Sequence, residues 1–290
     1  MKTSLPKKVY LNGEIMDAGS AKVSVFDRGF LFGDGIYEVM AQINGHFLYK
    51  EAHLRRMADG LQKISIEFNP DVLATEIPKL LRASELLNKG CLLYIQITRG
   101  VAPRKHAFPT STQPTFMMYA THNTFPGINT VQASVVTSED FRWTRCDIKM
   151  ISLLGNVMAN EYAAQQNCYE TVLIRNGMVT EASHSNVFFV KDRIVYTHPA
   201  NRYILNGITR QIVLELCAGL NLEVREEAVK KDAMFKMDEA FLTGTTTQIA
   251  SIKQLDHHFF YQGDGIGEIT KKLQEAYSEV KNEKKSSLPR

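Results

Sequence analysis

The sequence has few cysteines and no long hydrophobic segment. Its four cysteines stand at positions 91, 146, 168 and 217 without a C-x-x-C pair, so we predict neither a zinc site nor a thioredoxin-type motif. No apolar run approaches the ~18 residues of a membrane-spanning helix, and the amino-terminal MKTSLPKK is followed by no apolar signal segment. We therefore expect reduced thiols, no bound metal, no membrane contact and a cytoplasmic location.

An excess of either charge is also absent. The chain has 34 Lys and Arg against 31 Asp and Glu, a net charge of +3, and it shows no basic stripe or nucleic-acid recognition motif. We expect no nucleic-acid partner. Apolar residues make up 44% and charged residues 22% of the 290 positions, which is ordinary for a soluble globular protein. A chain of this length can bury a core without disulfides or metals.

Three Asn-Gly pairs, at 12–13, 44–45 and 176–177, interrupt β-like runs and predict hairpin turns. Further strands are expected at 91–100 and 114–120. Apolar residues at helical spacing predict helices over 51–64, 71–87, 152–167, a stretch opening at 207, and 266–281. We predict an α+β protein with two lobes of largely antiparallel sheet and packed helices. The limits are 1–120 for a small lobe, 121–127 (THNTFPG) for the connection, and 128–290 for a larger lobe.

The usual phosphate-binding and hydrolase motifs are missing, but two segments have the character of anion-binding loops. The sequence has no G-x-x-x-x-G-K-[ST], no G-x-S-x-G and no H-E-x-x-H. Gly207-Ile208-Thr209-Arg210 opens a predicted helix, where free N–H groups and the helix dipole favour a phosphate. TGTTTQ (243–248) follows a predicted strand and offers several hydroxyls. Each segment alone is explained equally well as a helix cap or a turn; together they favour a phosphorylated ligand.

Two charged residues are candidates for the chemistry. Lys149 lies between a β-like run and a predicted helix, where it is either a surface residue or an amine suited to Schiff-base chemistry. Glu181 lies on the return strand of the third hairpin, facing water or pairing with a protonated pyridine nitrogen. The residues alone leave both alternatives open.

The combination of Lys149, Glu181-x-x-x-x-Asn186-x-Phe188, Gly207-Ile208-Thr209-Arg210 and the Thr-rich loop resembles the fold-type IV pyridoxal-phosphate enzymes. The similarity extends from VSVFDRGFLFGDGIYEV (23–39) to MDEAFLTGTTTQI (237–249). This family includes D-amino acid aminotransferases, branched-chain aminotransferases and aminodeoxychorismate lyases. The resemblance implies pyridoxal 5′-phosphate as the cofactor, amino acids and 2-oxo acids as substrates, and a homodimer.

The resemblance also implies roles for individual residues. Lys149 would bond the cofactor aldehyde and act as the catalytic base, and Glu181 would pair with the pyridine nitrogen. The residues expected to bind the 5′-phosphate are Arg56, Ile208, Thr209, Gly244 and Thr245. Two of the positions depart from the D-amino acid enzymes, which tend to have serine at Gly244 and a small hydroxyl residue at His184. Periodicity alone predicts that Arg56 is exposed to solvent, because it lies opposite the apolar stripe of its helix.

One segment distinguishes the D-amino acid aminotransferases from the other members of this family. GVAPRKHAFP (100–109) resembles the loop with which D-amino acid aminotransferases present an Arg and a His to the substrate carboxylate of the neighbouring subunit. Arg104 and His106 match those two positions, and Tyr37 matches the tyrosine that completes the carboxylate site. We therefore predict a D-amino acid aminotransferase that uses D-alanine or a similar donor and 2-oxoglutarate. The alternatives are an L-branched-chain aminotransferase, a lyase of the same fold, and a non-catalytic binding protein.

Overall fold

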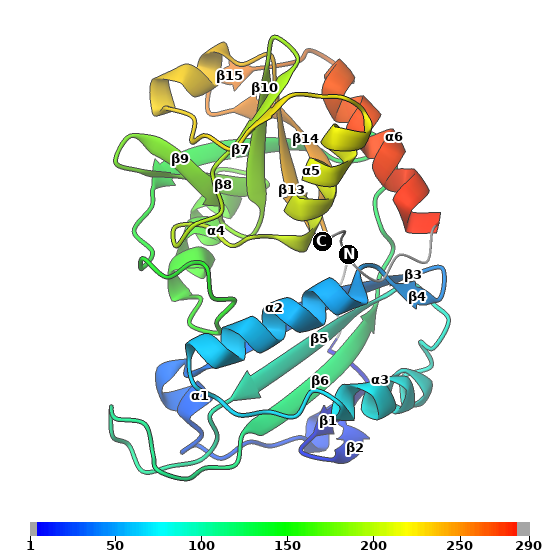
Figure 1. Cartoon of the computed structure of the whole chain (residues 1–290), viewed down its shortest axis with the longest axis vertical. Coiled ribbons are helices and arrows are strands. Elements are labelled where there is room, and N and C mark those ends of the chain that lie inside the picture. The colour runs from blue at the N-terminus through cyan, green and yellow to red at the C-terminus, as the bar shows by residue number, and fades with distance from the viewer. Residues whose placement is uncertain (1–4, 283–290) are drawn as a thin grey trace. The chain divides into compact units, whose positions relative to one another are not determined.

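The computed structural model describes residues 5–282, and its contacts divide the chain into two compact units. The first unit runs to Thr124 and includes Ile148–Ser152. The second comprises Phe125–Asp147 and the chain from Leu153 onward. The segment Ile148–Ser152 thus groups with the first unit, although it lies within the range expected for the larger lobe. Each unit combines a sheet with helices, which confirms the α+β class (Figure 1).

The first unit is built on a six-stranded sheet in which all neighbouring strands are antiparallel, in the order β2-β1-β6-β5-β3-β4. The strands are β1 (Lys8–Leu11), β2 (Glu14–Asp17), β3 (Gly35–Ile43), β4 (His46–Phe47), β5 (Cys91–Thr98) and β6 (Thr115–His122). In β5 the buried residues Cys91, Leu93, Ile95 and Ile97 alternate with more exposed ones, because successive side chains of a strand point to opposite faces. That buried face forms the core of the unit.

Turns and helices of the first unit follow the sequence pattern closely. Asn12-Gly13 and Asn44-Gly45 have positive φ at both residues, as a type I′ turn requires. The helices are α1 (Arg28–Phe32), α2 (Lys50–Lys63) and α3 (Val72–Ala83), and a 3₁₀ turn spans Ala18–Ser20. Helix α2 packs on β3 (Figure 1). Helix α3 ends earlier than predicted, and Glu85 beyond it has a φ of 60°, which no right-handed helix accommodates.

The second unit has a nine-stranded mixed sheet, in the order β12-β11-β10-β13-β14-β7-β8-β9, with β15 pairing on β14. Its strands are β7 (Gln132–Glu139), β8 (Glu170–Arg175), β9 (Met178–Ala182), β10 (Asn186–Lys191), β11 (Ile194–Thr197), β12 (Val224–Arg225), β13 (Glu239–Gly244), β14 (Gln248–Leu255) and β15 (His258–Phe259). The pairs β7–β8, β7–β14 and β11–β12 are parallel, and the other pairs are antiparallel. The largely antiparallel pairing agrees with the prediction.

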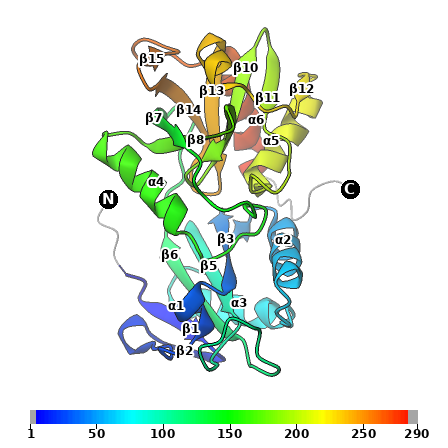
Figure 2. The ribbon, with the colours of Figure 1, turned by 90° about the vertical axis from the view of Figure 1, so that its left-hand side faces the viewer.

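Three α-helices cover this second sheet. They are α4 (Leu154–Gln165), α5 (Ile208–Gly219) and α6 (Glu268–Asn282), and a 3₁₀ helix spans Lys231–Lys236. Helix α4 packs against β7 and β8 (Figure 2), whereas α5 packs on β13 and on α6. All three helices were expected from periodicity within a few residues. The turn Asn176-Gly177 between β8 and β9 again has positive φ at both positions.

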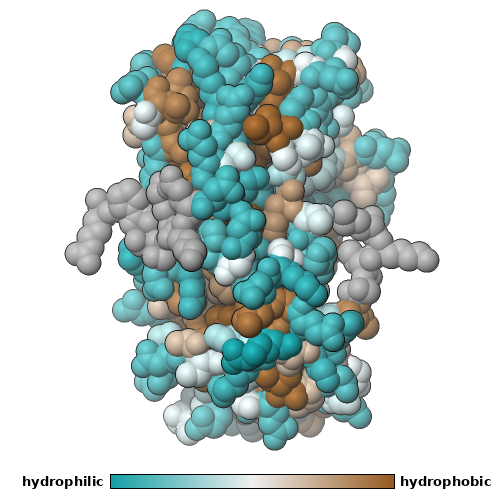
Figure 3. Space-filling view, turned by 90° about the vertical axis from the view of Figure 1, so that its right-hand side faces the viewer, coloured by the Kyte–Doolittle hydropathy of each residue, from teal (hydrophilic) through white to brown (hydrophobic). Residues whose placement is uncertain are grey.

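The surface and the thiols bear on the class of protein. On the face drawn in Figure 3, hydrophilic side chains predominate and hydrophobic ones form small groups between them. Within residues 5–282, no helix has both the length and the hydropathy needed to cross a membrane. All four cysteines are free thiols, and Cys91, Cys146 and Cys217 are buried.

Candidate active site

Lys149 belongs to the short segment Ile148–Ser152, which lies beside β3 in the first unit. The backbone N–H of Tyr37 donates to the carbonyl of Lys149 at 2.9 Å, and Met150 forms a β-bridge with Ile36. The Lys149 amine stands 4.1 Å from the centroid of the Tyr37 ring. In the described part of the chain this amine has no hydrogen bond or ion pair. Lys149 therefore lies beside Tyr37, and its amine forms no ion pair with a carboxylate of the described residues.

Arg56 is turned toward the sheet, and the periodicity-based prediction that it is exposed is wrong. Its side chain is only 14% exposed. The guanidinium donates to both carboxylate oxygens of Glu38, from Nε at 3.0 Å and from Nη2 at 2.6 Å. His53, one turn earlier on α2, contacts Glu38 Oε1 at 2.9 Å. A buried carboxylate on β3 therefore draws Arg56 inward.

The negative charge of Glu38 is strongly compensated by its neighbours. Burial by itself would raise the pKa of Glu38, but the charges and hydrogen bonds of Arg56 and His53 hold it far below its usual value. Burial lowers the pKa of His53, so Arg56 supplies most of the positive charge at neutral pH. No sequence motif points to Glu38, although strand alternation places it on the same face as buried Ile36 and Met40.

Arg104 and His106, predicted to contact the substrate, lie together over one aromatic ring. The Arg104 guanidinium carbon is 5.3 Å from the centroid of Phe32, and the rings of His106 and Phe32 are 5.7 Å apart. Tyr37 instead stacks on Tyr94 at 5.6 Å. Within residues 5–282 no hydrogen bond or ring contact joins Tyr37 to Arg104 or His106. The structure brings two members of the predicted carboxylate site together and places the third beside Lys149.

In the second unit, Glu181 is a buried residue of β9 rather than a solvent-facing one, with 6% of its surface exposed. Its Oε1 accepts a hydrogen bond from Arg142 Nη1 at 2.7 Å. Its Oε2 accepts from Asn186 Nδ2 and from the backbone N–H of Leu205, both at 3.1 Å. Burial nevertheless outweighs these partners and raises the pKa of Glu181 to about 7. The site therefore stabilises the carboxylate charge only in part.

The charge of Glu181 is only partly compensated because Arg142 also binds Asp140. Asp140 accepts from its Nε at 2.9 Å and from its Nη2 at 3.0 Å, and Arg175 also lies 3.1 Å from Asp140. Sequence analysis identified neither Asp140 nor Arg142, because both stand in an irregular segment without periodicity. A protonated ring nitrogen near Glu181 would supply the missing positive charge.

The predicted phosphate-binding segments lie side by side in the second unit. Helix α5 begins at Ile208, and no side chain caps its start at Gly207. A Cβ at Gly207 would collide with the amide oxygen of Asn186, and one at Gly244 would stand 3.3 Å from Ser185 Oγ. The turn 183–186 therefore lies against both segments; its approach to Gly207 requires glycine, and its approach to Gly244 leaves little room for a larger residue.

The donors in this region fit a phosphate. Thr209 is buried at the open end of α5, where backbone N–H groups lack helical partners. Thr245 is half-buried in the neighbouring turn. The hydroxyl of Thr243, buried at the end of β13, has no hydrogen-bond partner among the described residues. Glycines that admit close approach and an unpaired hydroxyl together form a cradle of the kind that phosphates occupy.

His184, the second departure from the D-amino acid enzymes, lies in the same turn. Its Nδ1 is 3.2 Å from Oε1 of the fully buried Glu170. Glu170 also accepts hydrogen bonds from the hydroxyls of Ser183 and Ser185 and from the backbone N–H of His184. The imidazole is therefore held by a carboxylate that the rest of the turn also contacts.

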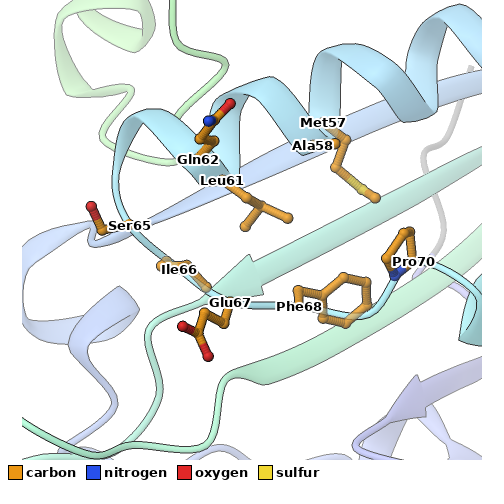
Figure 4. A pocket seen from close by; sticks show the side chains of 9 residues that line it. All are labelled: Met57, Ala58, Leu61, Gln62, Ser65, Ile66, Glu67, Phe68 and Pro70. Carbon is orange, nitrogen blue, oxygen red and sulfur yellow. The ribbon is translucent and has the colours of Figure 1, made fainter.

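A separate pocket of about 530 Å³ lies in the first unit, between α2 and residues 65–70. Met57 and Leu61 point from α2 toward the segment that carries Ile66 and Phe68 (Figure 4). None of the residues predicted for the active site lines it. Among residues 5–282 no group of three His, Cys, Asp or Glu could hold a metal ion.

Comparison with known proteins identifies the family of this chain. Residues 35–255 match the amino-transferase class IV family. The D-alanine aminotransferase of Staphylococcus haemolyticus is 38% identical over 281 residues, covering 93% of this chain and 96% of its own. That of Bacillus licheniformis is 38% identical over 276 residues, covering 93% and 95%.

A solved structure shows the same fold. A branched-chain amino acid aminotransferase of Escherichia coli superposes with a TM-score of 0.87 at 21% identity, covering 95% of this chain and 94% of the other. Pyridoxal phosphate is the cofactor of class IV aminotransferases. Within the first unit the Lys149 amine has the chemistry that its aldehyde requires. Within the second unit Glu181 is a carboxylate that a protonated ring nitrogen would suit, and the region beside Gly207 and Gly244 has donors that its phosphate requires. This chain belongs to the class IV aminotransferases.

Proposed function

We propose that this protein is a D-amino acid aminotransferase that moves the amino group of D-alanine or a similar D-amino acid to 2-oxoglutarate, giving a 2-oxo acid and D-glutamate. The observation that carries the proposal is the pairing of Arg104 and His106 over Phe32. A guanidinium offers a planar fork of donors suited to a carboxylate. Two relatives at 38% identity are D-alanine aminotransferases, which supports the same handedness here.

In this proposal the predicted site residues have defined tasks. When bound, pyridoxal phosphate supplies an aldehyde for the amino group and a ring that withdraws electrons from the substrate Cα. Lys149 would hold the cofactor at its aldehyde, and its amine would move the proton at the substrate Cα. Glu181 keeps the ring nitrogen protonated. Arg56, Ile208, Thr209, Gly244 and Thr245 bind the phosphate, and Arg104, His106 and Tyr37 orient the substrate carboxylate.

A paired assay with D-alanine and L-leucine as donors tests the proposal. We expect faster transamination of D-alanine. Arg104→Ala should lower kcat/KM for D-alanine by about 30-fold to several thousand-fold, because truncating one partner of a desolvated charge pair costs roughly 2–5 kcal/mol. Faster turnover of L-leucine, or unchanged D-alanine kinetics in Arg104→Ala, would instead favour a branched-chain aminotransferase.

The role of Lys149 has its own test. Borohydride reduction followed by peptide mapping should place a pyridoxyl adduct on Lys149, and the purified protein should be yellow. Lys149→Ala should lower proton-transfer rates by at least about 10²–10⁴-fold. An adduct mapped to another lysine would contradict the assignment, and a colourless protein without adduct would indicate a binding protein.

We also propose that the protein works as a homodimer in the cytoplasm. On α4, Ala159 and Ala163 are buried, whereas Leu154, Val157 and Met158 are 73%, 59% and 55% exposed. A helix that is apolar on both faces is normally buried on both, and a second copy of the chain would cover the exposed one. Four free thiols are compatible with a reducing compartment.

Light scattering after gel filtration tests the dimer. The wild-type protein should have twice the chain mass, and Val157→Asp should shift it toward the monomer. Ala83→Asp, at an exposed position at the end of α3, is the control and should stay dimeric. A monomeric wild type would refute this part of the proposal.

A further inference from the structure

Arg28 is a buried charged residue to which the proposed function assigns no role. It is the first residue of α1 and is 3% exposed. Its Nε donates to Asp34 Oδ2 at 2.7 Å. Its Nη1 donates to the carbonyl of Lys105 at 2.6 Å, and Nη2 lies 3.5 Å from the carbonyl of His106. These two carbonyls belong to the loop 100–114, which precedes β6 and carries Arg104 and His106.

The charges around Arg28 explain why it contacts this loop. Asp34 is shared with a second buried guanidinium, because Arg99 donates to it from Nε at 2.8 Å and from Nη2 at 3.0 Å. Two cations therefore meet one carboxylate, and the surplus donors need other acceptors. Arg99 uses the carbonyls of Ile64 and Ser65. Arg28 uses the carbonyls of Lys105 and His106. The backbone of the loop therefore directs these two carbonyls toward Arg28.

The protonation of Asp34 is consistent with this arrangement. Burial would raise the pKa of Asp34, but the hydrogen bonds and charges of Arg99 and Arg28 hold it below its usual value. Asp34 therefore remains a carboxylate across the neutral range and keeps both guanidinium groups in place. Because Arg99 is the last residue before the loop and its guanidinium lies 3.5 Å from the ring of Phe108, the same carboxylate also orients a second contact to the loop.

The side chains of the loop meet the other end of α1. Phe32 closes this five-residue helix, and the Arg28 guanidinium carbon lies 4.7 Å from the centroid of its ring. Arg104 and His106 contact the same ring. Arg28 thus fixes the backbone between the two residues, while Phe32 contacts their side chains.

We propose that Arg28, held by Asp34, is a positioning residue for carboxylate recognition: it fixes the loop 100–114 so that Arg104 and His106 reach one substrate carboxylate together. The inference rests on the proposed function, which assigns those two residues to the carboxylate. Without Arg28 the donors remain in the chain but lose their common orientation. A misplacement of about 1 Å in such a site costs up to about 100-fold in kcat/KM, and here the loss falls on KM because the misplaced donors bind the substrate carboxylate.

The experiment uses the holoenzyme and steady-state kinetics with D-alanine and L-alanine. Arg28→Met should raise KM for D-alanine by about 10-fold to 100-fold, change kcat by less than about threefold, and lower the ratio of D- to L-alanine activity. Cofactor content should stay at the wild-type level. Arg28→Lys keeps the charge but not the fork of donors, so it should show the same change with a smaller size, and it serves if Arg28→Met does not fold.

A control separates positioning from simple destabilisation. Glu239 in the second unit is 6% exposed and accepts the N–H groups of Ile269 and Thr270 at the start of α6. Glu239→Gln should lower the melting temperature without raising KM. If Arg28→Met lowers the melting temperature similarly and leaves KM and stereoselectivity unchanged, Arg28 is only a structural residue and the inference is wrong.

A double variant separates this inference from the proposed function. In an Arg104→Ala background, Arg28→Met should add less than about threefold to KM, because the guanidinium, the stronger of the two donors that it positions, is already gone. Fully additive effects would overturn the inference and leave the proposed function intact. If Arg104→Ala alone leaves D-alanine kinetics unchanged, the proposed function fails whatever Arg28 does.

Discussion

Glu38 in the first unit and Glu181 in the second are both buried glutamates that contact an arginine, yet their pKa values move in opposite directions. Glu38 receives two hydrogen bonds from Arg56 and one contact from His53, and its pKa falls. Glu181 receives one hydrogen bond from Arg142, which Asp140 also binds, and its pKa rises to about 7. Burial alone therefore does not decide the shift; the hydrogen bonds that each carboxylate receives and the charges beside it, including the Asp140 charge near Glu181, also contribute.

The difference separates a fully compensated carboxylate from a partly compensated one. Glu38 is compensated within the protein, so it fixes Arg56. Glu181 is compensated only in part, and in the proposed function the protonated ring nitrogen of pyridoxal phosphate would supply the missing positive charge. A residue with a strongly shifted pKa is thus a better candidate for cofactor contact when its own partners leave the charge incompletely balanced.

The largest expected effect is on folding stability. Glu38→Gln removes the carboxylate that Arg56 and His53 share and should lower the free energy of unfolding by about 3–5 kcal/mol, the usual cost of breaking a buried pair. Urea denaturation of the cofactor-free protein measures it. Glu181→Gln is the matched variant and should cost less, since Arg142 keeps Asp140. Equal losses would mean that the two carboxylates are equally compensated.

The pH dependence of the free energy of unfolding provides a second test of the difference between Glu38 and Glu181. The folded-state pKa of Glu181, about 7, lies above its ordinary value of 4.5, so the folded protein binds more protons than the unfolded chain between these values. Relative to Glu181→Gln, the wild-type free energy of unfolding should therefore fall as pH rises from about 4.5 to 7. The change is at most about 3 kcal/mol, at roughly 1.4 kcal/mol per pKa unit. A difference that does not vary with pH would refute the raised pKa.

Turnover should distinguish the two residues in another way. Glu181→Gln should lower kcat about 10-fold to 150-fold, which corresponds to roughly 1.5–3 kcal/mol for a hydrogen bond to a charged group. The cofactor should remain bound through its phosphate, as absorbance after gel filtration will report. Glu38→Gln should instead release cofactor, because Arg56 loses its orientation. Wild-type turnover in Glu181→Gln would mean that Glu181 has no part in the chemistry.

The smallest effect is expected at Gly244. A serine there places Cβ 3.3 Å from Ser185 Oγ, closer than most such contacts, and should cost about 0.5–1.5 kcal/mol through a shifted rotamer. Thermal unfolding measures the loss. Ser185→Ala removes the neighbouring oxygen, so adding it to Gly244→Ser should cost less than the two separate changes predict. Additive losses would show that the crowding lies elsewhere.

Much of the fold follows from local pattern. The Asn-Gly turns, strand β5 and helices α2 and α5 depend on residues that are close in sequence, and each of these predicted elements is confirmed. Helix α3 is shorter than its pattern because Glu85 leaves the helical region. Parallel pairing between β7, β8 and β14 was not predicted, since it joins segments far apart in the chain.

The sequence by itself determined the class of fold, the turns, and the motifs whose resemblance points to Lys149, Glu181 and the two phosphate-binding segments. Only the tertiary structure decided that Arg56 faces Glu38, that Arg142 is shared with Asp140, and that Arg28 holds the loop of Arg104. The physical reason is that periodicity reports which face of one element is apolar. It carries no information about the charged side chain that another element places opposite, and that neighbour decides both the orientation of a buried cation and the pKa of a buried acid.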